Sequence, residues 1–94
     1  FPDVDFPVVA AVVSYPGASP EAVEEDVIRP IEEAVSTIAG IDDIQSTAQQ
    51  GQGIVVMFFD LEVQSADAAQ DVRDKMASVG ARLPDGADDP TVLR

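Results

Sequence analysis

The sequence contains no cysteine and no histidine among its 94 residues. Without cysteine there is no thiol nucleophile and no disulfide, and without histidine the commonest general base at neutral pH is missing. Zinc sites built from cysteine and histidine are excluded for the same reason. A Ser–His–Asp triad is excluded as well. The 18 carboxylates are the most numerous remaining groups that could take part in acid–base chemistry.

Basic residues are also scarce. Lysine and arginine together number 5, against 18 for aspartate and glutamate, which gives a formal net charge of −13. Nucleic-acid binding needs clustered basic side chains to meet the phosphates, and docking on anionic lipid needs polybasic segments. The charge balance therefore argues against both kinds of partner.

Long hydrophobic runs are absent too. A membrane-spanning helix needs about 20 apolar residues, whereas the longest runs here, Pro7–Val13 and Ile54–Phe59, have the length of a strand. No signal peptide is visible, and the sequence begins at Phe1 rather than at methionine. We interpret it as part of a longer protein. Its length suits a single domain, residues 1–94.

Strand-like segments occur at four places. Pro7–Ser14 and Ile54–Phe59 are apolar without alternation, which is typical of strands covered on both faces. Ile41–Gln50 is a more polar strand, joined to the next by a hairpin loop at Gly51–Gly53. Thr91–Arg94 has the pattern of a short, truncated fourth strand.

The first predicted helix begins at Ser19, a candidate N-cap, with Pro20 at the first helical position. Gly40 is predicted to end it as the C′ residue. Pro30 interrupts the segment and predicts a kink, because proline has no backbone N–H to donate. The apolar stripe of this helix has helical spacing and comprises Val23, Val27, Ile31, Ala34 and Ile38.

The second predicted helix has Ser65 as its candidate N-cap and Asp67 in its first turn, where the helix dipole favours an anion. Leu83-Pro84 marks its stop. Its predicted core stripe comprises Ala68 or Ala69, Val72, Met76, Val79 and Leu83.

This order of elements predicts an α+β fold: a ferredoxin-like split βαβ arrangement, βαββα plus a truncated fourth strand. The sheet is expected to be antiparallel with strand order 4-1-3-2 and both helices on one face. The other face would then expose apolar side chains of the two central strands, and such patches usually bind a partner. We expect the excised fragment to self-associate through this sheet.

The carboxylates give no enzyme signature. Most lie at positions expected on the solvated faces of the two helices, and the Asp85–Asp89 loop lacks the terminal glutamate of a calcium loop. The loop after the first strand, Tyr15–Ala18, lacks the phosphate-binding arginine of acylphosphatase, an enzyme with the ferredoxin-like fold. We therefore predict no catalytic residue, no cofactor site and no metal site.

Along its whole length the sequence resembles the start of the periplasmic region of resistance-nodulation-division (RND) efflux transporters. The most specific features are the Tyr15-Pro-Gly-Ala turn and the Pro30-Ile-Glu-Glu helix segment. The resembling segments are Phe1–Val8, Ser14–Glu24, Pro30–Glu33, Ile38–Asp42, Ser46–Gly51, Phe59–Leu61, Ala68–Lys75, and Leu83-Pro84 with Pro90. The pattern is closer to the hydrophobe/amphiphile branch than to the heavy-metal branch.

The resemblance implies that the chain is the first porter subdomain, the periplasmic segment that follows the first transmembrane helix. Members of this family are inner-membrane trimers that exchange protons for drugs or other amphiphiles. They work with a periplasmic adaptor protein and an outer-membrane channel. Their proton-carrying carboxylates lie in membrane helices, so this subdomain is expected to contribute to trimer packing and to the central pore rather than to catalysis.

By the same resemblance, the second helix lines the central pore of the trimer. Counting back from Leu83-Pro84, the family's pore-facing positions fall on Gln70, Asp74 and Ala77. Three copies of Asp74 around a threefold axis would repel one another unless each pairs with a cation, such as Arg73 or Lys75 of a neighbouring copy. An ordinary solvated helix face remains the alternative for these positions.

A different class of function also fits the residues: a free-standing, acidic, ferredoxin-like binding or regulatory module. The two hypotheses differ in what the parent gene must encode. A transporter requires an apolar span of about 20 residues just before Phe1.

Overall fold

The computed structural model describes residues 7–93. Phe1–Phe6, which carry most of the first resembling segment, and Arg94, predicted to end the last strand, lie outside the described residues. In chain order the elements are β1 (Val8–Ser14), α1 (Pro20–Val23), the π-helical turn η1 (Glu24–Ile28), α2 (Arg29–Val35), β2 (Ile41–Gln49), β3 (Gln52–Phe59), α3 (Ser65–Gly80) and β4 (Thr91–Leu93).

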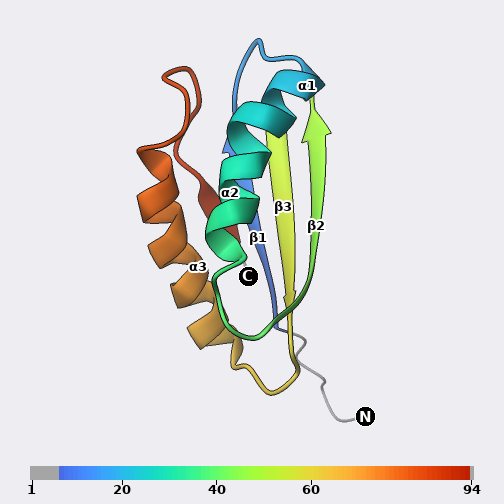
Figure 1. Cartoon of the computed structure of the whole chain (residues 1–94), viewed down its shortest axis with the longest axis vertical. Helices are drawn as coiled ribbons and strands as arrows, with labels where there is room; N and C mark the ends of the chain where they lie inside the picture. The colour runs from blue at the N-terminus through green and yellow to red at the C-terminus, as the bar shows by residue number, and fades with distance from the viewer. Residues whose placement is uncertain (1–6, 94) are drawn as a thin grey trace.

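The four strands form one antiparallel sheet with the order β2-β3-β1-β4. The helical segment α1–η1–α2 and helix α3 lie side by side over one face of this sheet (Figure 1). The predicted α+β fold, its strand order and the placement of both helices on one face are therefore confirmed.

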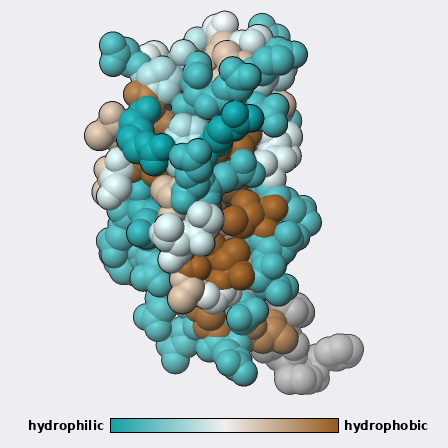
Figure 2. All heavy atoms as spheres, viewed as in Figure 1, coloured by the Kyte–Doolittle hydropathy of each residue, from teal (hydrophilic) through white to brown (hydrophobic). Residues whose placement is uncertain are grey.

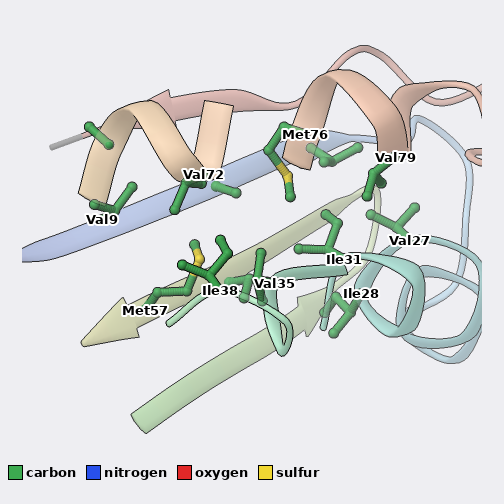
Figure 3. Packing of buried hydrophobic residues seen from close by; sticks show 14 of the residues in the cluster. Val9, Val27, Ile28, Ile31, Val35, Ile38, Met57, Val72, Met76 and Val79 are labelled. Carbon is green, nitrogen blue, oxygen red and sulfur yellow. The ribbon is translucent and has the colours of Figure 1, made fainter. Parts of the chain in front are cut away.

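The core lies between the helices and the sheet. Along β1 and β3, alternate side chains are buried and half-buried, so one face of each strand packs under the helices. This layer contains Val9 and Met57 of the sheet, Ile31 of the first helical segment and Val72 of α3 (Figure 3). The predicted stripe of α3 is confirmed: Ala68, Ala69, Val72, Met76 and Val79 are buried, and Leu83 is half-buried against the core.

The first predicted helix starts as expected but contains a π-helical turn in place of a simple kink. Ser19 caps it, because its Oγ accepts a hydrogen bond from the Ala22 N–H at 3.2 Å, and proline occupies the first turn. The π turn ends at Ile28, two residues before Pro30, and the Arg29 N–H donates a hydrogen bond to the Glu24 carbonyl. An inserted residue of this kind relieves a helix in which a donor is missing.

The predicted stripe of this helical segment is largely confirmed. Val23, Val27, Ile31 and Ile38 are buried, and Ala34 is half-buried against the core. The structure adds Ile28 in the π turn and Val35 in α2, which are buried as well.

We expect Pro30→Ala to leave the fold intact and to change the free energy of unfolding by only about 1 kcal/mol. Alanine supplies the missing N–H, but it also removes the reason for the π turn that buries Ile28. Urea denaturation followed by circular dichroism measures the change. A variant without helical signal would refute this prediction.

The predicted C′ role of Gly40 is wrong. Helix α2 ends at Val35, and the hydroxyls of Ser36 and Thr37 donate hydrogen bonds back to the carbonyls of Glu33 and Ala34. Such side-chain bonds compete with continuation of the helix. Gly40 instead sits in the turn before β2 with a φ of +90°, and a Cβ on it would lie 2.7 Å from Val63 Cγ2.

Two other element ends differ by a residue from their predicted positions. The hairpin between β2 and β3 turns at Gln50–Gly51 rather than at Gly51–Gly53, because Gln49 pairs with Gln52. Gly51 has a φ of +76°, a conformation that glycine adopts without strain. Helix α3 includes Ser65, and Gln64 occupies the N-cap position without a side-chain hydrogen bond.

Among residues 7–93, the fourth strand pairs with the middle of β1, where Ala10, Ala11 and Val12 face Leu93, Val92 and Thr91. The expectation of a short fourth strand is therefore confirmed. Within the described part of the chain, no helix is long and apolar enough to cross a membrane.

Candidate functional site

Helix α3 presents its outer face away from the sheet, and the three predicted pore-facing residues share it. Gln70, Asp74 and Ala77 are all exposed, and their spacing of four and three residues places them on one side of the helix. The buried stripe of α3 lies on the opposite side. Gln70 Nε2 donates a hydrogen bond to Asp74 Oδ1 at 2.9 Å, which fixes the orientation of the carboxylate.

Two grooves run along the two sides of this outer face. One, of about 440 Å³, lies between α3 and the segment leading into β4, and its walls include Arg73, Met76, Ala77, Gly80, Asp89 and Pro90. The other, of about 370 Å³, lies between α3 and the turn after α2, and its walls are Thr37, Ile38, Ala39, Asp71, Asp74 and Lys75. Asp74 and Ala77 therefore border different grooves.

The helix-bearing side of the molecule is mostly hydrophilic, with hydrophobic atoms gathered toward the middle of the view (Figure 2). Glu33 and Arg82 form the one ion pair found among the described residues, at 3.0 Å, and both side chains are more than half exposed. This pair ties α2 to the segment after α3. A surface pair of this kind adds little stability, so it does not mark a site.

Among the described residues, no three histidine, cysteine, aspartate or glutamate side chains come together in a way that could hold a metal ion. The chemistry available on the outer face of α3 is that of an exposed carboxylate, an amide, an arginine and a small apolar side chain. Such groups can form contacts and attract or repel ions.

The uncovered face of the sheet is the second candidate surface. Its half-buried residues come from alternate positions of the two central strands: Val8, Ala10, Val12, Ile54, Val56 and Phe58. On the neighbouring β2 the same face is polar, because Gln45 pairs with Val56 and Thr47 with Ile54. The apolar surface therefore runs along the middle of the sheet and stops at β2.

The grooves beside α3 could not be found from the sequence. Their walls include Thr37–Ala39, which precede α3 by a whole β-hairpin, and Asp89-Pro90, which follow it in a loop; neither segment has a motif of its own. The sequence shows the helical spacing of Gln70, Asp74 and Ala77. Only the tertiary structure shows that Arg73 and Lys75 border different grooves.

The sequence matches the AcrB/AcrD/AcrF family over residues 1–94. Curated relatives include the multidrug resistance protein MdtC of Erwinia tasmaniensis and that of Pantoea ananatis, each 38% identical over 85 residues. Each alignment covers 90% of this chain and 8% of the relative, so the chain spans only a small part of the proteins it matches.

Among solved structures, the fold is similar to that of a heavy metal efflux pump determined by X-ray crystallography. The TM-score is 0.88 and the sequence identity 22%, and the match covers 99% of this chain and 9% of that chain. This likeness confirms the fold, and the sequence matches extend over nearly all of the chain. The chain therefore belongs to the AcrB/AcrD/AcrF family, the RND efflux transporters that its sequence resembles.

Proposed function

We propose that this chain is the first periplasmic porter subdomain, residues 1–94, of a proton-driven RND pump of the hydrophobe/amphiphile branch. In this role the outer face of α3 lines the central pore of a trimer, and the subdomain contributes to trimer packing rather than to catalysis. The observation that carries the proposal is the alignment of Gln70, Asp74 and Ala77 on an exposed helix face, opposite a fully buried stripe.

The family relationship supports the wider setting. The curated relatives with 38% identity are multidrug resistance proteins, which favours the amphiphile branch over metal transport. The parent protein would then lie in the inner membrane, with this portion in the periplasm. Its partners would be the other subdomains and protomers of the trimer, a periplasmic adaptor and an outer-membrane channel.

We expect Ala77→Leu in the parent transporter to lower drug efflux several-fold without lowering the amount of protein in the membrane. Ala77 is exposed, so the fold tolerates a larger side chain at this position. In a trimer, three leucine side chains, one from each copy, would narrow the pore. The matched control is Ala39→Leu, an exposed alanine in the turn after α2. The rate of efflux of a fluorescent amphiphile from whole cells is measured for both variants. Equal efflux by the Ala77 variant and wild type would argue against the pore assignment.

The alternative remains a free-standing acidic binding or regulatory module. The parent reading frame separates the two, because a porter subdomain must follow an apolar span of about 20 residues. A gene that starts near Phe1 and stops near Arg94 would exclude the transporter and leave the module.

We further expect the isolated 94-residue chain to self-associate through the uncovered sheet face, and more strongly as salt rises. Burying apolar area stabilises a dimer by about 25 cal/mol per Å², while the net charge of −13 opposes it until salt screens the repulsion. Size exclusion with light scattering at low and high salt measures the mass. Val56→Lys, which places a charge on this face, should keep the chain monomeric. Wild-type monomers under both salt conditions would rule the association out.

A further inference from the structure

The groove between α3 and the segment leading into β4 carries opposite charges at two separate places. Arg73 borders it near the middle of α3. Asp89 borders it beside Gly80, the last residue of the helix, where a Cβ on Gly80 would lie 3.7 Å from Asp89 Oδ1. Gly80 follows Arg73 by seven residues, which is about 10 Å along the helix axis. The groove therefore has a cationic end and an anionic end.

Neither of these two charges is neutralised within the part of the chain that the structure describes. Arg73 and Asp89 are both exposed, and the one ion pair found among residues 7–93 joins two other side chains, Glu33 and Arg82. In the same range, neither side chain takes part in a hydrogen bond. Both groups can therefore pair with opposite charges on a ligand.

The other walls of this groove are uncharged. They comprise Met76, which is almost fully buried, the small residues Ala77 and Gly80, and Pro90 and Val92. Their side chains offer apolar contact and contain no hydrogen-bonding group of their own except the weakly accepting sulfur of Met76. The groove therefore suits a ligand that is charged at its two ends and apolar between them.

Strand β4, which contributes Val92 to the groove, is also the last strand of the sheet. In the order β2-β3-β1-β4 it pairs with β1 alone, so within residues 7–93 its other edge has no strand partner. Such an edge presents backbone N–H and C=O groups that can pair with an extended chain. Because an extended chain advances about 3.3 Å per residue, a peptide of about three to five residues spans the distance between the two charges.

We propose that this groove binds a short, extended peptide with free termini. The terminal carboxylate of the peptide pairs with Arg73, and its terminal ammonium group pairs with Asp89. The peptide backbone follows the outer edge of β4, and small apolar side chains lie over Met76 and Ala77. A single amino acid carries its two charges too close together to reach both ends. This binding site goes beyond the proposed function and does not depend on it.

The test measures binding of a tetrapeptide, two valines between two alanines, to the full-length parent protein in detergent by isothermal titration calorimetry. We expect saturable binding. Amidation of the carboxyl terminus of the peptide, or acetylation of its amino terminus, should each weaken binding by about three- to fivefold, the effect of losing one exposed ion pair. Free valine should not bind at concentrations that saturate the site with the tetrapeptide.

Two variants locate the binding site. Arg73→Gln should weaken binding of the unmodified tetrapeptide as much as amidation does, and amidation should have no further effect on that variant. Asp89→Asn should cancel the effect of acetylation in the same way. The matched controls are Lys75→Gln and Asp71→Asn, which remove the same charges from the groove on the other side of α3 and should leave both effects of modification unchanged.

Three results would overturn the proposed peptide site. The first is a tetrapeptide that does not bind, and the second is equal binding of the modified and unmodified peptides. The third is an effect of amidation or acetylation that persists in the Arg73 and Asp89 variants, because the peptide would then bind elsewhere on the parent protein. None of these results bears on the proposed function, since the experiment measures neither assembly nor efflux.

Discussion

Val27→Asp is expected to unfold the chain. Val27 has no exposed surface and lies in the π-helical turn, where it packs between the sheet and the neighbouring helix residues (Figure 3). An unpaired carboxylate there loses its hydration without gaining a partner, at a cost of about 4 kcal/mol or more. That cost is comparable with the free energy of unfolding of a small domain, which lies near the low end of about 5–15 kcal/mol. Circular dichroism and urea denaturation would show the loss.

Two further variants show whether the buried charge or the loss of apolar contacts causes the unfolding. Val27→Ala removes apolar contacts but adds no charge, and should cost about 2 kcal/mol while the fold persists. Ala66→Asp adds the same charge at an exposed position of α3 and should leave the free energy of unfolding almost unchanged. If Val27→Asp denatured at the same urea concentration as wild type, the packing described for η1 would be incorrect.

Gly53→Leu is expected to destabilise the chain by about 3 kcal/mol or more. Gly53 lies on β3 directly beneath the π turn, and even a Cβ at this position would come within 3.0 Å of Val23 and 3.2 Å of Ile28. The glycine lets the wide turn approach the sheet closely. A leucine side chain would push α1 and η1 off β3, and the core would lose contacts on both sides.

Two alanine variants, one at Gly53 and one at Gly80, allow the loss of stability in Gly53→Leu to be compared with smaller changes. Gly53→Ala should cost less than the leucine variant, because its neighbours need to move by only a few tenths of an ångström. Gly80→Ala should instead stabilise by up to about 1 kcal/mol, since a Cβ there makes only an ordinary contact, 3.7 Å from Asp89 Oδ1. Thermal melts of the three variants give the order directly. A Gly53→Leu variant as stable as wild type would contradict the close packing of η1 on β3.

The parts of the fold that were predictable depend on local sequence signals. Ser19 followed by Pro20 specifies a helix start, and the stripe of α3 from Val72 to Val79 follows from helical spacing. The π turn was not predictable, because it reflects both the missing donor of Pro30 and the room left by Gly53 on a distant strand. Residue spacing alone describes an ideal helix and cannot show an inserted residue.

The same distinction applies to the candidate site. Gln70, Asp74 and Ala77 could be placed on one helix face from the sequence alone, and the structure bears out that they are exposed together. The sequence alone could not show that Arg73 and Lys75 border different grooves. The walls of these grooves come from the turn after α2 and the segment before β4, so they depend on the tertiary structure.

Electron cryomicroscopy of the full-length parent protein tests the central claim most directly. The account predicts three copies around a common axis, with the three α3 helices nearest that axis and Ala77 pointing toward it. A map in which the outer face of α3 contacts another domain, or lies at the outer surface of the assembly, would contradict the account.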